Sequence, residues 1–220
     1  LGINTNSVSA GLPVFANGTY VYLSAENIGT ADPILSSIFT LTTRPSGSSA
    51  VLEDVGSLGW KGLKADVKGA YTITLNITTA GGNASTTLTV YAGNYVGVGG
   101  FDGVAASYPN CMYCHTGQAK FDDIFARWKE TGHANTLKKA LDTWPFFSTS
   151  CLKCHTTGTD YNLVAANNGF DDVTIGWVWT NPPDPGKWDA FKAAFPGAVQ
   201  FATIGCENCH GAGSNHPGPQ

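Results

Sequence analysis

The sequence predicts two unlike halves, an all-β half followed by a half of short helices and irregular structure. Residues 1–93 contain neither cysteine nor histidine, and β-branched and apolar residues alternate there between turns rich in Gly, Pro and Asn. Residues 111–220 hold all six cysteines and all five histidines. Residues 94–110 are rich in glycine and low in charge, which indicates a linker. A chain of 220 residues is long enough for two such domains.

Four segments of the first half predict half-buried antiparallel strands. They cover residues 19–24, 38–42, 71–77 and 86–91. Their side chains alternate with a period of two and include many Thr, Val and Ile residues, as strands with one buried face require. Gly81, Gly82 and Asn83 lie between the last two strands and favour a hairpin turn. Short strands over about 90 residues predict a β-sandwich.

The second half contains one clear helical pattern. Its apolar face is formed at positions i, i+3, i+4 and i+7 by Phe121, Ile124, Phe125 and Trp128. Asp122 and Asp123 lie near the expected start, where the helix dipole favours negative charge, and Gly132 is the expected end. A second short helix is expected from about 135 to 141.

Every cysteine belongs to a Cys-x-x-Cys-His motif, and the motif occurs three times. This spacing is typical of covalent c-type haem, in which two thiols bind one porphyrin and the histidine binds its iron. The predicted attachment thiols are those of Cys111, Cys114, Cys151, Cys154, Cys206 and Cys209. The predicted proximal ligands are His115, His155 and His210. The sequence therefore predicts three haem c groups.

Two other uses of Cys-x-x-Cys fit less well. A thioredoxin-type redox pair does not need a histidine after the second cysteine. A structural zinc site uses four ligands and usually pairs two such motifs, which leaves three motifs unmatched. Haem also accounts for the aromatic residues of the second half as packing partners, although Trp177, Trp179, Trp188, Phe191 and Phe195 fit an ordinary core equally well. The glycine-rich segment 94–110 fits either a linker or a close approach to a haem face.

The sequence contains one histidine fewer than three haem irons need as axial ligands. His133 and His216 lie outside the motifs and are candidates for distal ligands of haem iron, although a lone histidine is more often a surface residue. Three irons need six ligands, and the chain offers five histidines. Met112, the only methionine, lies between two attachment cysteines, points away from that iron and could reach only the iron of another haem. One haem is therefore five-coordinate, or takes a Tyr, Lys or N-terminal amine ligand, or uses a ligand from another protein or from residues beyond this sequence.

Composition narrows the compartment and the partners. The formal net charge is −4 and charged residues make up 13%, which argues against nucleic acid or an anionic membrane as partner. No apolar run approaches the ~18 residues of a membrane span. The chain begins at Leu1 without Met, so we expect a processed mature form. Because c-type haem is attached outside the cytoplasm, we expect an extracellular, cell-surface or periplasmic protein.

Three sites match the Asn-x-Ser/Thr pattern of N-glycosylation. They begin at Asn17, Asn76 and Asn83, all in the first half. The pattern also arises by chance in a segment so rich in Thr and Ser.

The second half resembles the multihaem c-type cytochromes of bacterial and archaeal respiration. The resemblance lies in Trp-x-x-Thr-x-His-Ala at 128–134, in Cys-x-x-Cys-His-Thr-x-Gly at 151–158, and in the segments 167–172 and 204–216. It implies that His133 and His216 are distal ligands, often to a haem attached elsewhere in the chain. It also implies redox partner proteins or extracellular acceptors and, as in some members, self-assembly into an electron-conducting filament. Members commonly continue to a further haem motif, whereas this sequence stops at Gln220.

The first half resembles PKD-like and related immunoglobulin-like modules. The resemblance lies in residues 39–52 and in 66–72, where Tyr71 matches a tyrosine corner whose hydroxyl bonds the upstream backbone. The fold class expected is thus an N-terminal all-β immunoglobulin-like sandwich plus a mostly α or irregular multihaem cytochrome c domain at 111–220. Such modules usually serve as spacers, adhesion units or packing surfaces.

The motifs are compatible with three classes of function. An electron carrier, in a filament or soluble, uses all three haems. A redox enzyme acting on nitrite, hydroxylamine, sulfite or peroxide requires one open haem position, yet no pocket rich in Arg, Lys or His is evident near a motif. An adhesion or scaffold protein leaves three covalent cofactors without a purpose. The sequence favours the electron carrier, with no catalytic residue.

Overall fold

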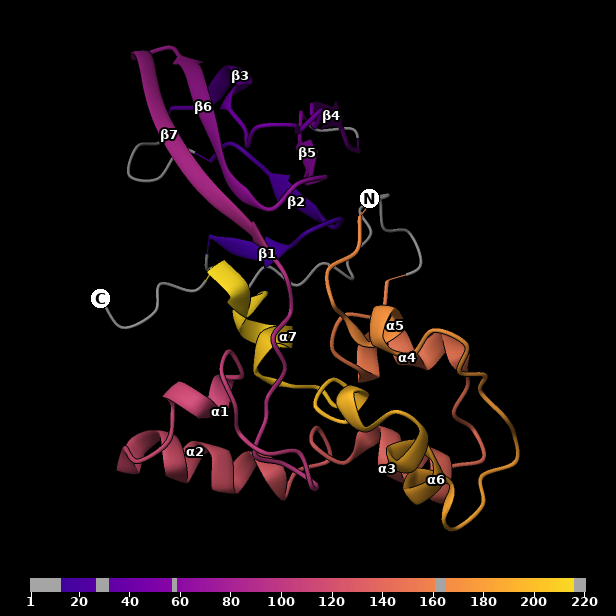
Figure 1. Ribbon diagram of the computed structural model, residues 1–220. Helices are drawn as coiled ribbons and strands as arrows, with labels where there is room; N and C mark the ends of the chain where they lie inside the picture. The colour runs from indigo at the N-terminus through magenta and orange to yellow at the C-terminus, as the bar shows by residue number, and fades with distance from the viewer. Residues whose placement is uncertain (1–12, 27–31, 57–58, 161–164, 216–220) are drawn as a thin grey trace.

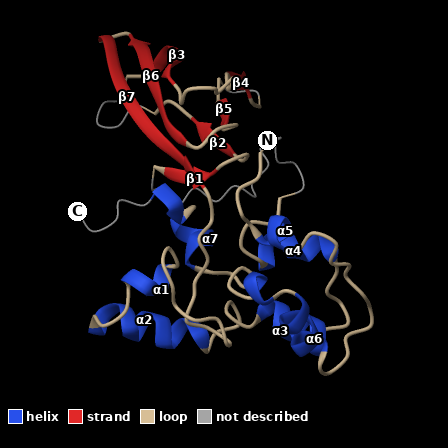
Figure 2. Ribbon diagram, viewed as in Figure 1, coloured by secondary structure: helices blue, strands red, loops and turns tan. Residues whose placement is uncertain are grey.

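The computed structural model describes residues 13–26, 32–56, 59–160 and 165–215 (Figure 1). Figure 2 shows the strands gathered at one end of the molecule and the helices at the other. Two sheets and several short helices therefore follow one another along the chain, in the order that the two-halves prediction requires. Each helix among the described residues is too short or too polar to cross a lipid bilayer.

The β half contains a four-stranded and a three-stranded sheet. The first has the order β1 (Val14–Ala16), β7 (Gly82–Gly93), β6 (Gly69–Thr79), β3 (Ile34–Thr43). The second has the order β2 (Tyr20–Leu23), β5 (Lys61–Lys64), β4 (Leu52–Asp54). Neighbouring strands are antiparallel except β1 and β7, which are parallel. The four predicted strands are confirmed as β2, β3, β6 and β7, but the hairpin turns at Ala80 and Gly81, earlier than expected, because Gly82 and Asn83 already pair with β6.

Both sheets contribute to one hydrophobic core. Tyr71 and Ile73 of β6 pack with Leu63 of β5 and Val90 of β7, and all four are buried. On β6 and β7, threonines such as Thr72, Thr74 and Thr89 alternate with these buried residues on the opposite face, because side chains one residue apart on a strand point to opposite sides of the sheet. The period-two pattern thus places the core on one face of β6 and β7.

The helical half is built of short helices. They are α1 (Cys111–Cys114), α2 (Ala119–Lys129), α3 (Thr136–Asp142), α4 (Thr149–His155), α5 (Phe170–Val173), α6 (Lys187–Ala194) and α7 (Cys206–His210), with single 3-10 turns at Pro196–Ala198 and Gly213–Asn215. The two predicted helices are confirmed as α2 and α3. However, α2 ends at Lys129 rather than Gly132. The amides of Glu130 and Thr131 donate to the carbonyls of Arg127 and Trp128, three residues back, instead of four residues back as in an α-helix.

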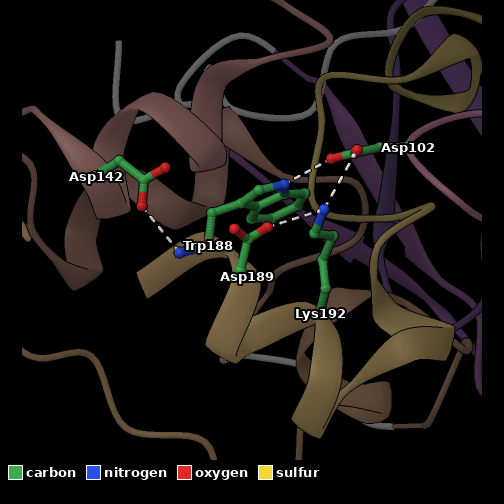
Figure 3. Close-up of polar contacts among 5 residues, drawn as sticks. All are labelled: Asp102, Asp142, Trp188, Asp189 and Lys192. Carbon is green, nitrogen blue, oxygen red and sulfur yellow. Dashed lines mark hydrogen bonds and ion pairs between the residues drawn. The ribbon is translucent and has the colours of Figure 1, made fainter. Parts of the chain in front are cut away.

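Trp188 anchors α6 in the core of this half (Figure 3). Its backbone amide donates to the Asp142 carboxylate at 2.9 Å, and its indole nitrogen donates to Asp102 at 2.5 Å. Lys192 bridges Asp102 and Asp189 at 3.4 and 3.1 Å. The Trp188 ring stacks on Phe191, and both are buried, as the ordinary-core interpretation of these aromatic residues predicts.

Direct hydrogen bonds join the two halves. The Asn17 side-chain nitrogen donates to the Ala166 carbonyl at 3.2 Å, and the Asn167 side chain donates to the Asn17 carbonyl at 3.0 Å. A side chain at Gly18 would come within 2.4 Å of the Ala165 carbonyl oxygen, so glycine permits this close approach. Residues 94–110 contain no helix or strand, and Val98 within them is buried.

The Tyr71 hydroxyl forms the upstream bond expected from the sequence. It donates to the Val67 carbonyl at 2.7 Å, and the Val67 amide donates back to it at 3.2 Å. Asp66 beside it accepts bonds from Ser48 and Ser49. Burial alone would raise the pKa of the Asp66 carboxyl, but these hydrogen bonds outweigh burial and lower it.

We expect Tyr71→Phe to lower the free energy of unfolding of the β half by about 1–3 kcal/mol, because it removes both hydrogen bonds to the partly buried Val67 backbone. Urea titration followed by amide hydrogen exchange in β6 measures this change. Tyr91→Phe is the matched control, since Tyr91 lies exposed on the neighbouring strand, and should change stability by less than about 0.5 kcal/mol. Equal effects of the two substitutions would contradict the assigned role of the Tyr71 hydroxyl.

Candidate haem-binding region

The three Cys-x-x-Cys-His motifs lie on three separate short helices. They occupy α1, the C-terminal part of α4, and α7. Residues at i and i+3 lie on the same face of a helix, so the two thiols of each motif point to one side, with the histidine next to them. The second cysteine is exposed in every motif and the first is partly buried. Each motif therefore presents a thiol pair at the surface of the helical half.

The helix α7 is bound to the segment that leads into the first motif. Glu207, between the two cysteines of α7, is only 4% exposed. Its carboxylate accepts backbone N–H bonds from Val96 at 2.9 Å, Gly97 at 2.8 Å and Gly213 at 2.7 Å. Burial raises the pKa of Glu207, and these donors oppose the rise. Gly97 and Val98 in turn accept amide bonds from Cys111 and Met112.

The same helix is bound to the residues that follow the second motif. Asn208 of α7 donates to the Thr156 carbonyl at 3.0 Å and accepts from the Thr157 hydroxyl at 2.6 Å. The Thr157 hydroxyl also accepts from the Gly205 amide at 3.2 Å. The residues between the third pair of cysteines thus connect this motif to both others. Figure 1 shows α7 between α1 and α4.

The first cysteines of the first and third motifs are in contact. A side-chain hydrogen bond joins Cys111 and Cys206. This bond, with burial and the nearby Glu207 charge, raises the pKa of Cys111, whereas the same bond lowers the pKa of Cys206. In the second motif, the bond from the Ser148 backbone lowers the pKa of Cys151. A lowered pKa favours the thiolate, which is the nucleophilic form of cysteine.

The motif histidines lie against aromatic rings. The His115 ring is 4.5 Å from that of Phe121 on α2, and the His155 ring is 5.6 Å from that of Phe147. The Nδ1 atom of His155 is buried and has no hydrogen-bond partner among the described residues. A buried imidazole nitrogen without a partner is uncommon, and it marks the His155 ring as one whose polar groups the described residues alone do not satisfy.

Apolar side chains around the motifs are left uncovered. The apolar face of α2 contains no buried residue, although its spacing suits a core helix, and Ile124 on it is exposed. Phe146 and Ile175 are 74% and 83% exposed, and Tyr113 within the first motif is exposed as well. Large flat apolar groups at the motifs would bury this surface. Thiol pairs, histidines and uncovered apolar surface together fit haem c.

Of the two candidate distal ligands, His133 lies within the described residues and His216 does not. His133 is exposed, and its carbonyl accepts the Ile204 amide at 3.0 Å, which places it just before the third motif. His216 lies outside the described residues. The side chain of Met112 is buried. Over the described ranges, no group of three or more His, Cys, Asp or Glu side chains converges as a metal ion bound by protein alone would require.

Sequence reasoning missed the connecting residues Glu207 and Asn208. They fill the two variable positions of the third motif, where the pattern allows any residue, so the pattern drew no attention to them. The glutamate between two attachment cysteines could have indicated these contacts. A carboxylate next to a buried group must either be solvated or accept several hydrogen bonds.

No family model matches the chain, and no curated protein matches it.

We expect Glu207→Gln to lower the free energy of unfolding of the helical half by about 1–3 kcal/mol. Both carboxylate oxygens of Glu207 accept backbone N–H bonds. The side-chain nitrogen of a glutamine would replace one of these oxygens and would then face an N–H group, with which it cannot form a hydrogen bond. The holoprotein would be compared by urea titration at neutral pH with Glu130→Gln, whose side chain is exposed just after α2. A loss no greater than that of Glu130→Gln would show that Glu207 does not hold α7 in place.

Proposed function

We propose that this protein transfers electrons outside the cytoplasm through three covalently bound c-type haems. The observation that carries the proposal is that all six cysteines lie in Cys-x-x-Cys-His motifs, each on a short helix with an exposed second thiol. Uncovered apolar surface next to the motifs supports it. When bound, haem iron supplies reversible one-electron oxidation and reduction.

The side chains of the region have distinct tasks in this proposal. The thiols of each motif hold one porphyrin edge, and His115, His155 and His210 provide the proximal ligands. Phe121 and Phe147 orient two of these imidazoles. The apolar face of α2 excludes water, which keeps the site in a low dielectric. Histidine ligation and a single methionine in the chain favour low reduction potentials.

The contacts of the helices indicate which of the proposed attachment sites are neighbours. Because Cys111 and Cys206 are in contact, the first and third attachment sites adjoin. Because Asn208 binds Thr156 and Thr157, the third site also adjoins the second. We therefore infer that the α7 site lies between the other two and that three bound haems would follow the order first, third, second. This order differs from the order of the motifs in the sequence.

The wider assignment rests on resemblance. The helical half is proposed to be a multihaem cytochrome c domain of respiratory type. The β half is proposed to be a PKD-like, immunoglobulin-like module. Its partners are redox proteins or extracellular acceptors, and copies of the chain assemble into a filament on or outside the cell.

The histidine count favours one alternative, a redox enzyme with one open haem position. Three haem irons have six axial positions, and the sequence contains five histidines to fill them. An iron left with one protein ligand can bind a small molecule such as nitrite, hydroxylamine or sulfite.

Potentiometric titration of the purified holoprotein tests electron transfer. We expect reversible uptake of three electrons per chain at low potential, followed through haem absorption, because every iron has at least one histidine ligand. A carrier releases these electrons to a second redox protein without consuming a small substrate. Absence of reversible haem reduction would contradict the proposal, and steady turnover of nitrite, hydroxylamine or sulfite would favour the enzyme.

We expect His133→Ala to add one carbon monoxide-reactive haem per chain, because one iron loses its distal ligand. The measurement is the dithionite-reduced spectrum before and after carbon monoxide, with the unchanged chain as reference. Lys129→Ala is the control, since Lys129 is exposed on the same segment. If both variants bind carbon monoxide as the unchanged chain does, His133 is not an axial ligand.

A further inference from the structure

The three Asn-x-Ser/Thr sites lie in different environments. N-linked glycans are attached to the side-chain nitrogen of asparagine. In Asn17 this nitrogen donates to the Ala166 carbonyl, and the residue is only 6% exposed at the junction of the two halves. The Thr19 hydroxyl of the same site donates to the Ala16 carbonyl at 2.7 Å. The folded structure therefore leaves no room for a sugar on Asn17.

The other two sites lie together on the hairpin of β6 and β7. Asn76 pairs with Ser85, and Thr78 pairs with Asn83, so each asparagine faces the hydroxyl residue of the other site. All four are exposed. They share the face of the sheet opposite the buried Tyr71 and Ile73, because positions two apart on a strand point the same way. These four residues therefore form one block that contains two complete glycosylation sites on a single surface.

The strands around this block contain no charged residue, although the Asp32 carboxylate lies beside Gly81 in the hairpin turn. None of the strands β3, β6 and β7 contains Asp, Glu, Lys or Arg. The face continues as rows of threonine, in which Thr72 pairs with Thr89 and Thr74 with Thr87 through their hydroxyls at 3.3 and 3.5 Å. Ile38 on β3 is 61% exposed and stands beside Asn76 in the same row.

Within the described residues, the edge strand of this sheet has neither charge nor proline of its own, and only irregularities of register near its two ends interrupt it. The strand β3 lies at the edge of the four-stranded sheet and is ten residues long. Natural proteins protect long edge strands with charges, proline or a covering element, because an open edge pairs with other chains. A large hydrated group attached next to Ile38 would supply the missing protection.

We propose that Asn76 and Asn83 are sites of N-linked glycosylation and that Asn17 is not. In the reaction, the Asn side-chain nitrogen bonds to C1 of an oligosaccharide. The bond from C1 to the phosphate oxygen of a polyprenyl phosphate donor breaks. The lipid phosphate leaves with the bonding electrons, and the nitrogen loses one proton to the transferase. In Figure 1 the far end of the β6–β7 hairpin points away from the helices, so the sugars stand clear of the haem-binding region.

Glycopeptide mass spectrometry of the protein from its native source tests the proposal. We expect oligosaccharide on the peptides that contain Asn76 and Asn83 and none on the peptide that contains Asn17. Unmodified Asn76 and Asn83 would overturn the proposal, as would sugar on Asn17.

Substitutions in the native host test the purpose of the sugars. We expect the double variant Asn76→Gln with Asn83→Gln to lose the mass of both glycans and to aggregate more, by light scattering. Its haem content per chain should not change, which separates this result from the electron-transfer proposal. Asn17→Gln is the matched control for glycan mass and should leave it unchanged. A double variant whose glycan mass equals that of the unchanged chain would contradict the assignment.

Discussion

The arrangement of the helical half depends on one buried carboxylate, that of Glu207. A carboxylate in the interior is costly unless several donors satisfy it, and here the amides of Val96, Gly97 and Gly213 do so. Through these bonds the third motif is fixed to the chain that enters the first motif, while Asn208 beside it binds the residues after the second. The short motif helices are thereby held in one relative arrangement, with α7 in the middle.

The helical half leaves part of its apolar surface exposed, although it has a buried core. The face of α2 contains no buried residue, and Phe146 and Ile175 are largely exposed. The proposed haems would complete this core, since they are large, apolar and covalently fixed. Each half has a hydrophobic core of its own. Specific hydrogen bonds of Asn17 and Asn167 contribute to the junction between the two halves.

Much of the fold could be predicted from local pattern. Alternation of Thr with apolar residues predicted the strands, and the spacing of Phe121, Ile124, Phe125 and Trp128 predicted α2. The pairing of strands, including the parallel pair β1 and β7, could not be predicted, because it depends on contacts far apart in the sequence. The motifs identified the candidate attachment residues, but not which motifs adjoin. That information lies in Glu207, Asn208 and Thr157, whose partners are set by tertiary structure.

The most direct test of covalent haem is peptide mass spectrometry of the denatured, reduced native protein, with a count of free thiols. The account predicts one haem mass on each of the peptides that contain Cys111, Cys151 and Cys206. It also predicts no reactive thiol, because both cysteines of each motif are thioethers. Six reactive thiols and peptides without haem would contradict it, and would leave the three motifs as free thiol pairs or ligands for another metal.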